Sequence, residues 1–156
     1  MAKSLEPSYD TVMVPGQQKA EMSPPAARQT VSANPLIENL LLAVLAVNNW
    51  SLERVFELRD PLRDAGLFDL AVVSNLSEAE IARRLTIAGY ARGEYMTTLM
   101  ALRFLSVTQV LSTDQLARLA AAIQAGHRDA AEAILNRIRG VGPAVLRNFW
   151  ILQGVG

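Results

Sequence analysis

The stretch Ile138-Arg139-Gly140-Val141-Gly142-Pro143 decides how the C-terminal part of this chain folds. Two glycines separated by one residue permit a sharp chain reversal that uses positive φ. Proline suits the first turn of a helix, because the N–H group it lacks would have no partner there. Helical patterns of apolar residues lie on both sides of the stretch. We therefore predict a helix-hairpin-helix at 129–153, with Pro143 opening the second helix.

The predicted hairpin has the chemistry of an anion site. At a helix N-terminus the first backbone N–H groups have no partner within the helix, and their partial positive charge suits a phosphate oxygen. The amides of 140–144 would take this role, with Val141 filling the gap between the helices. Arg137, Arg139 and Arg147 lie within about one turn, and arginine adds charge-assisted bonds to phosphates. The alternative is a plain helix junction whose glycines only form the corner.

The rest of the chain predicts helices and no sheet. A helix from Pro35 to about Val47 is apolar on most faces and therefore central, and Asn48-Asn49 ends it. Further helical patterns cover about 51–62, 77–89, 92–107 and 112–126, and a short apolar run at 67–73 is either a helix turn or extended. Pro61 marks a kink or an end. The expected N-caps are Ser51, Ser77, and Ser112 or Thr113. We predict an all-α fold, a compact bundle of about seven short helices that ends in the helix-hairpin-helix.

Composition narrows the function classes. The chain has no cysteine, which excludes disulfides, thiolate metal sites and iron–sulfur clusters. His127 is the single histidine, so we expect no metal and no cofactor. Basic and acidic residues balance at 15 each, whereas dedicated nucleic-acid binders usually carry a basic excess. Any nucleic-acid site is therefore expected to be a local patch.

Targeting signals are not evident in the sequence. The longest apolar stretch, Leu40 to Val47, is far shorter than the roughly 20 residues of a membrane span. Lys3 has no apolar run behind it, so the pattern of a signal peptide is missing. We expect a cytoplasmic protein that makes no membrane contact.

Residues 1–34 differ in amino-acid composition from the rest of the chain. They hold Pro7, Pro15, Pro24 and Pro25 among serine, glutamine and small residues, and they show no helical period. This composition predicts a domain boundary near Asn34, with 35–156 as the helical domain. Two interpretations of 1–34 stand side by side: a disordered tail, or a segment that docks on a protein partner.

Three segments resemble the endonuclease III-type DNA glycosylases, a helix-hairpin-helix superfamily. The stretch Ile138 to Ala144 resembles the hairpin motif of that family, and Leu41 to Asn49 resembles its apolar helix that ends in a polar residue near the damaged base. The third segment resembles the family's glycine–tyrosine turn and following helix: Ile87-Ala88-Gly89-Tyr90-Ala91-Arg92, then Leu99, Leu102 and Phe104. The segments keep the family's order and cover about 35–154. The resemblance implies the helical-barrel half of that fold.

The same resemblance implies that the catalytic groups are missing. Bifunctional members use a lysine two residues after the second hairpin glycine, and this chain has Ala144 there. Residues 35–156 contain no lysine, and arginine stays protonated and cannot form the Schiff base. The family's catalytic aspartate follows the hairpin by about one and a half helices, whereas the printed sequence ends at Gly156. We therefore expect no catalytic residue and no enzymatic activity.

The resulting hypothesis is a non-catalytic module that grips the phosphate backbone of duplex DNA through hairpin 139–144. Arg137, Arg139, Arg147 and Arg92 would support the grip. Asn48 and Asn49 would contact or replace a displaced base. The alternative is a protein-interaction or assembly subunit that retains the fold without a DNA function. An active glycosylase ranks third, because it would still need a carboxylate after the hairpin.

Overall fold

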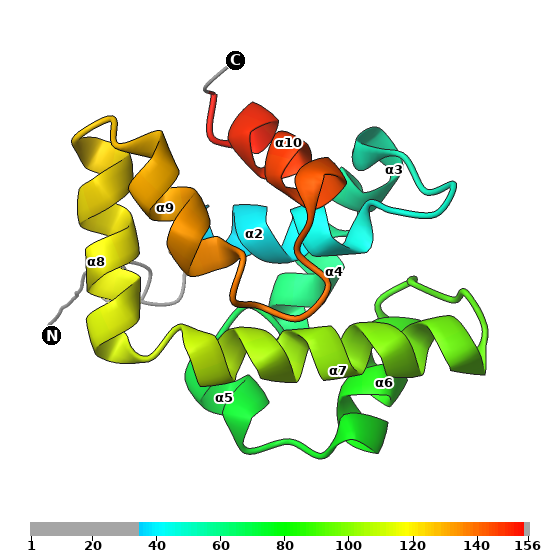
Figure 1. Cartoon of the computed structure of the whole chain (residues 1–156). Coiled ribbons are helices and arrows are strands. Elements are labelled where there is room, and N and C mark those ends of the chain that lie inside the picture. Colours follow the sequence, from blue (N-terminus) through cyan, green and yellow to red (C-terminus); the bar gives the residue numbers. More distant parts are fainter. Residues whose placement is uncertain (1–34, 155–156) are drawn as a thin grey trace, which may run out of the picture. The chain divides into compact units, whose positions relative to one another are not determined.

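The computed structural model describes residues 35–154, and every regular element in this part of the chain is a helix, which confirms the predicted all-α fold (Figure 1). The expectations for 1–34 lie outside the described residues. No helix within 35–154 is long and apolar enough to cross a membrane. The elements are α2 (Pro35–Leu45), α3 (Leu52–Phe56), α4 (Arg59–Asp64), α5 (Leu70–Ser74), α6 (Glu78–Ile87), α7 (Glu94–Val110), α8 (Thr113–Gln124), α9 (Arg128–Leu135) and α10 (Pro143–Leu152).

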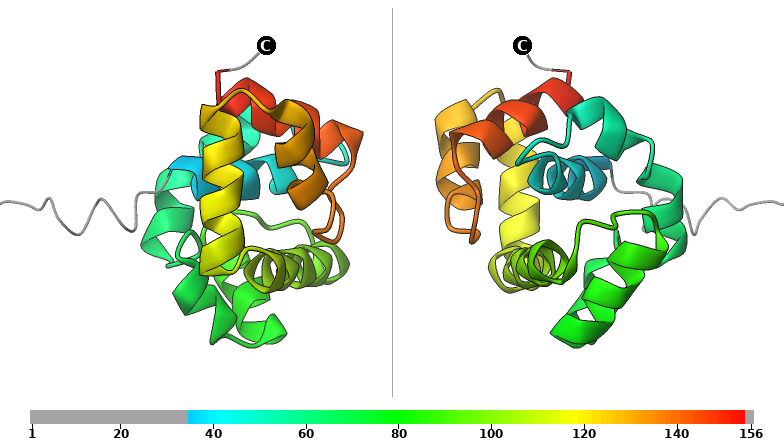
Figure 2. Two further views of the ribbon diagram at one scale, coloured as in Figure 1. Left: turned by 60° about the vertical axis from the view of Figure 1, so that its left-hand side comes forward. Right: turned by 90° about the vertical axis from the view of Figure 1, so that its right-hand side faces the viewer.

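Helix α2 is the centre of the helical domain, as its sequence predicts. Every side chain from Leu40 to Leu45 is fully buried, so the helix has no face in contact with solvent over this stretch. Figures 1 and 2 show α2 between α10 on one side and α7 on the other. A helix that is apolar all round gains stability only when neighbours cover it on all sides, and the remaining helices supply that cover.

Glu38 is a charged residue of α2 that is buried in the core. It is only 6% exposed, and its two carboxylate oxygens accept hydrogen bonds of 2.8 Å each from Nε and Nη2 of Arg63 on α4. Arg63 also donates to Asp60 from Nη1 at 3.0 Å. The hydrogen bond to Glu38 raises the pKa of Arg63. This two-pronged contact fixes α4 against α2, because a buried carboxylate must keep its partner.

Residues 35–154 form nine helices, whereas the sequence predicts about seven. The pattern over 51–62 is divided into α3 and α4, and the ambiguous run near 70 forms α5. Proline at position 61 lacks the N–H that a continuous helix would donate to Glu57, and its ring would clash with that carbonyl. The chain therefore ends α3 at Phe56 and restarts at Arg59, which leaves Pro61 in the first turn of α4, where a missing N–H costs little.

Serine hydroxyls begin three of the helices at the predicted positions. Oγ of Ser51 accepts from the amide of Arg54, Oγ of Ser77 from that of Glu80, and Oγ of Ser112 from that of Gln115. Each bond satisfies one first-turn amide that the helix itself leaves without an acceptor. Of the two candidates for the cap of α8, the structure selects Ser112.

Helices α9 and α10 pack against each other on either side of the hairpin. Indole Nε1 of Trp150 donates to Oε2 of Glu132 at 2.7 Å, and the guanidinium of Arg128 lies 4.7 Å from the centre of the Trp150 ring. The order helix, hairpin, helix predicted for 129–153 is therefore present. The first helix ends at Leu135 rather than near Ile138, since residues 136–140 form turns.

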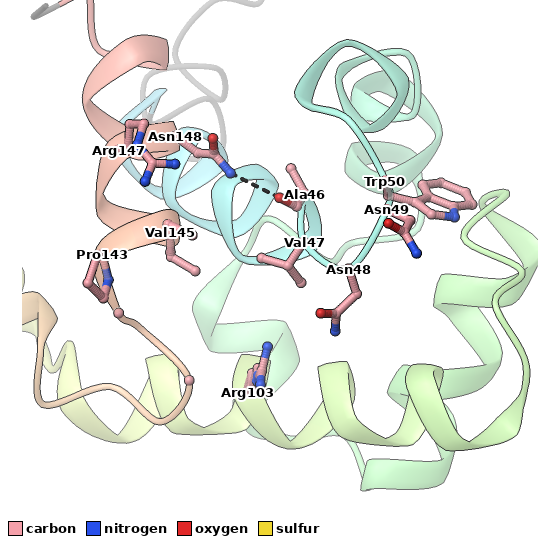
Figure 3. A pocket seen from close by; sticks show the side chains of 13 residues that line it. Ala46, Val47, Asn48, Asn49, Trp50, Arg103, Pro143, Val145, Arg147 and Asn148 are labelled. Carbon is pink, nitrogen blue, oxygen red and sulfur yellow. Dashed lines mark hydrogen bonds between the residues drawn. The ribbon is translucent and has the colours of Figure 1, made fainter.

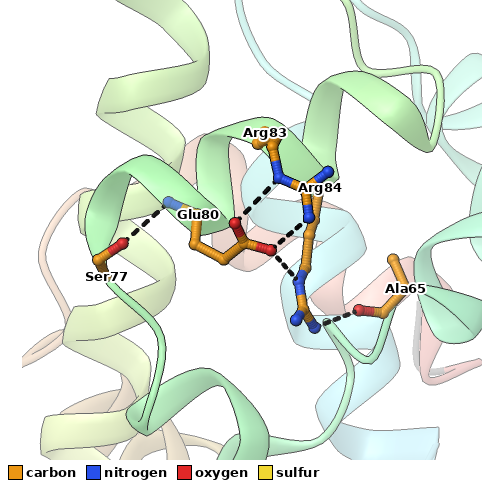
Figure 4. A network of polar contacts seen from close by, with 5 residues as sticks. All are labelled: Ala65, Ser77, Glu80, Arg83 and Arg84. Atoms are coloured by element: carbon orange, nitrogen blue, oxygen red, sulfur yellow. Dashed lines mark hydrogen bonds and ion pairs between the residues drawn. The ribbon is translucent and has the colours of Figure 1, made fainter.

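A network of charged side chains connects the N-terminal part of α6 to the end of α4. The carboxylate of Glu80 accepts two bonds from Arg83, at 2.9 and 2.6 Å, and one from Arg84 at 2.8 Å. Nη1 of Arg84 continues to the carbonyl of Ala65 at 3.0 Å, which links α6 to the end of α4 (Figure 4). Bonds from Arg83, and secondarily from Arg84, lower the pKa of Glu80 from 4.5 to about 2.

This shift makes part of the stability depend on pH. Because the pKa of Glu80 is lower in the folded chain than in the unfolded chain, its contribution is complete above pH 4.5 and is lost as the pH falls toward about 2. We expect Glu80→Gln to lower the urea midpoint at neutral pH and to approach wild type near pH 2. Glu78→Gln is the matched control, since Glu78 stands in the same first turn and forms no ion pair within 35–154. A Glu80→Gln deficit that persists unchanged at low pH would contradict the assignment.

Candidate functional site

A cleft of about 490 Å³ lies between the hairpin and the corner that follows α2 (Figure 3). It exists because α10 runs antiparallel to α2. Nδ2 of Asn148 donates to the carbonyl of Ala46 at 3.0 Å, and at the other end Nδ2 of Asn39 donates to the carbonyl of Leu152 at 3.3 Å. The N-terminal half of α10 therefore lies beside the C-terminal end of α2. The lining residues are Ala46, Val47, Asn48, Asn49, Trp50, Arg103, Gly140, Gly142, Pro143, Ala144, Val145, Arg147 and Asn148.

The cleft unites most of the predicted site residues. Asn48 and Asn49 line it from one side, and Gly140, Gly142, Ala144 and Arg147 line it from the other, although about a hundred residues separate the two groups. The other predicted residues lie outside the lining. Of these, Arg137 and Arg139 are exposed next to the hairpin, and Val141 is partly buried against the core. Arg92 binds the backbone of the turn that contains Asn48 and Asn49, which we call the asparagine corner.

The two hairpin glycines have different backbone geometries. Gly140 has φ +86°, a left-handed conformation in which glycine is strongly favoured. Gly142 has φ −133° and ψ −165°, which is extended backbone open to any residue. Hydrogen bonds hold the turn from both sides: the amide of Val141 donates to the carbonyl of Ile138 at 3.1 Å, and the amide of Arg139 donates to Oγ of Ser106 on α7 at 2.8 Å. Only the first glycine is therefore required by the turn itself.

The N-terminus of α10 faces the cleft without a cap. Gly142 occupies the N-cap position and has no side chain that accepts a hydrogen bond, and Pro143 follows as the first helical residue. Within the described part of the chain, the amides of Gly142, Ala144 and Val145 donate no hydrogen bond, while that of Leu146 donates to the carbonyl of Gly142. Three lining residues thus leave N–H groups available to an acceptor from outside.

The corner opposite the hairpin has an unusual backbone. Asn48 and Asn49 have φ of 55° and 75°, two consecutive left-handed residues that are not glycine. Asparagine tolerates this region better than most residues. Arg92, a predicted DNA contact, donates from Nη1 to the carbonyl of Val47 at 2.8 Å and from Nη2 to the carbonyl of Asn48. The structure thus uses its guanidinium to hold the backbone of the corner.

Trp50 stiffens the same corner. The guanidinium carbon of Arg54 lies 4.0 Å from the centre of its ring, that of Arg92 lies 5.3 Å away, and the ring centroid of Tyr90 lies at 4.9 Å. The phenol of Tyr90 is buried, which raises its pKa, and it donates to the carbonyl of Leu45 at 3.2 Å. These contacts with two cations and a second ring fix Trp50, the residue that directly follows the two asparagines.

Arg103 on α7 is a cleft residue that the sequence does not reveal. It is half-buried, and Figure 3 shows it reaching from α7 into the space below Asn48 and Val47. Its Nε is buried and has no hydrogen-bond partner. A Cβ built on Gly140 would lie 2.3 Å from that nitrogen, so the hairpin backbone packs directly on the guanidinium. In the sequence Arg103 is only a charge between Leu102 and Phe104, and no pattern there indicates this contact.

Positive charge without a partner gathers at the cleft and hairpin. Among the described residues, most arginines contact a carboxylate, an aromatic ring or a carbonyl oxygen: Arg54, Arg59, Arg63, Arg83, Arg84, Arg92, Arg118 and Arg128. The side chains of Arg103, Arg137, Arg139 and Arg147 make no such contact within 35–154. None of the described residues that line the cleft is Asp or Glu. A chain with no net charge therefore has a locally positive surface.

Comparison of the chain with family models, with curated proteins and with solved structures finds no match. The resemblance to the glycosylases consequently rests on the three sequence segments alone.

The packing of Arg103 on Gly140 predicts an excess cost for a side chain at this glycine. Gly126 is the matched control, because it has a similar φ of +77° and its Cβ would meet nothing within 4 Å. We expect Gly126→Ala to cost about 1 kcal/mol of unfolding free energy for the left-handed backbone alone. Gly140→Ala should cost roughly 1–2 kcal/mol more because Arg103 has to move.

Denaturant unfolding measures both costs. The excess at Gly140 should vanish when Gly140→Ala is made in an Arg103→Ala background, since the clash is then removed. Equal costs at Gly126 and Gly140 would show that Arg103 does not pack on the hairpin in solution.

Proposed function

We propose that this chain binds the phosphate backbone of duplex DNA through hairpin 139–144 and catalyses no reaction on it. The observation that carries the proposal is the distribution of charge. Of the arginines without a partner, Arg103 and Arg147 line the cleft together with the amides that donate no hydrogen bond, and Arg137 and Arg139 are exposed just before the hairpin glycines.

Phosphate oxygens match this arrangement chemically. Amides at a helix N-terminus bind anions through their N–H groups and the helix dipole. Arginine adds charge-assisted bonds to the same or adjacent phosphates. Arg137 and Arg139 are exposed just before the hairpin, and Arg147 is exposed one turn into α10, so they flank the amides on both sides. A neutral chain has little long-range attraction for DNA, which implies modest and strongly salt-dependent affinity.

The resemblance to DNA glycosylases supports duplex DNA as the ligand, but it does not support catalysis. Its three segments form the cleft or its supports: the hairpin, the asparagine corner and the turn at Tyr90 and Arg92. Ala144 stands where the nucleophilic lysine of bifunctional members would be. Asn48 points into the cleft (Figure 3), and in this proposal it contacts a base at the bound site.

A second candidate function is a protein-interaction subunit, and one surface favours it. Leu52, Glu53 and Phe56 of α3 form a groove of about 340 Å³ with Ile151 and Leu152 of α10. Phe56 is 42% exposed and Ile151 is 55% exposed. Exposed apolar side chains that share one groove are typical of protein contacts. This surface lies at the C-terminal end of α10, away from the amides at its start.

Salt titration of duplex binding tests the proposal. We expect binding at low ionic strength that weakens linearly on a log–log plot as salt rises. Arg139→Ala should weaken binding to all sequences alike and reduce the slope by about one. Arg118→Ala is the control, because Arg118 is exposed on α8 and, within residues 35–154, pairs only with Asp114. Absence of duplex binding at low ionic strength would reject the DNA function and favour the interaction subunit.

A change at Gly142 separates binding from folding. Gly142 is extended and a Cβ there meets nothing within 4 Å, so a side chain at this position fits the folded chain. Aspartate is also a favoured N-cap, so we expect Gly142→Asp to keep or raise thermal stability. Its negative charge should nevertheless weaken DNA binding by about tenfold, through repulsion and occupation of the free amides.

Gly142→Asn is the neutral control, since it offers the same cap without the charge. It should retain more of the binding than Gly142→Asp. Equal DNA affinity for the wild type and Gly142→Asp would show that the hairpin amides do not face the ligand.

A further inference from the structure

The least expected feature of the cleft is a cation placed inside it without a counter-ion. We propose that the cleft itself is a binding site for one phosphate group, with Arg103 and Arg147 as its cationic ligands. The inference rests on the proposed function in one respect, because the phosphate is then one of those in the bound strand. It adds a residue from α7, far from the hairpin in sequence, to the binding surface.

The surroundings of Arg103 indicate an anionic ligand. Its guanidinium is half-buried, makes no ion pair with any carboxylate in 35–154, and has a buried Nε without an acceptor. Taking a cation out of water without a partner is costly. Because Gly140 covers Nε, the terminal nitrogens are the ones left to face the cleft. An anion bound there would offset the cost of burying the charge.

The candidate donors come from separate elements that line one cleft, which favours phosphate over a carboxylate. Arg103 reaches in from α7, the amides of Ala144 and Val145 come from the first turn of α10, and Arg147 follows on that helix (Figure 3). Asn48 adds an amide side chain from the opposite corner. A carboxylate is planar and one arginine fork satisfies it, whereas a tetrahedral phosphate presents oxygens in several directions at once.

Phosphate reaches such a site from two sources: a nucleic-acid strand or a free phosphorylated molecule. Both share the chemistry that the cleft recognises, so the test uses inorganic phosphate first and duplex DNA second. The first arm measures thermal unfolding of the full chain in phosphate and in chloride at equal ionic strength. A ligand that binds only the folded chain raises the midpoint in proportion to its occupancy.

We expect phosphate to raise the unfolding midpoint of the wild type and of the control Arg118→Gln, whose arginine pairs with Asp114 outside the cleft. Arg103→Gln should weaken apparent phosphate affinity about tenfold or more, as expected for the loss of a charged hydrogen bond. Arg147→Gln gives the second reading, since Arg147 is exposed and its loss leaves the packing intact. An unchanged phosphate response in both variants overturns the proposal.

The second arm compares duplex binding by the wild type and Arg103→Gln. Weaker binding by Arg103→Gln, together with competition by inorganic phosphate, supports a strand phosphate in the cleft. Duplex binding that Arg103→Gln leaves unchanged overturns this inference while the hairpin grip stands. A chain that binds phosphate through Arg103 but binds no duplex supports the site and rejects the DNA function, which leaves a free phosphorylated molecule as the ligand.

Discussion

A helix without a polar face dictates the arrangement of this domain. Because Leu40 to Leu45 are fully buried, α2 has to be enclosed by other helices, and α10 is fixed along it by bonds from Asn39 at one end and from Asn148 at the other. The antiparallel direction follows from those two contacts. It brings the uncapped start of α10 beside the end of α2, so the cleft is a direct consequence of how the core is covered.

The walls of the cleft are held firmly. Arg92 binds carbonyls of the asparagine corner and contacts the ring of Trp50, and the amide of Arg139 donates to Ser106 on α7. A side chain that donates hydrogen bonds to backbone carbonyls restricts a loop to one conformation. A corner with two left-handed asparagines needs such support, since that backbone is disfavoured on its own. The backbone amides at the start of α10 that donate no hydrogen bond are therefore held in defined positions.

Charge is distributed in two distinct ways over the same chain. On α4, α6 and α8 the arginines pair with nearby carboxylates, as in the network around Glu80. At the cleft and hairpin they do not pair. The zero net charge therefore coexists with a local excess of positive charge, because none of the described acidic residues lines the cleft. Composition describes the whole chain, whereas the charge at the cleft depends on the few residues that line it.

Residue patterns that span only a few positions of the sequence were enough to predict most helices of this protein. Hydrophobic spacing predicted the helices, serines marked the caps, and the glycine–proline stretch located the hairpin and the start of α10. These features depend on residues a few positions apart. Tertiary structure alone decided three others: the packing of Arg103 on Gly140, the use of Arg92 as a brace for the asparagine corner, and the direction of α10 along α2. Each joins segments tens of residues apart, and such distances are set by how the core closes, which no local pattern encodes.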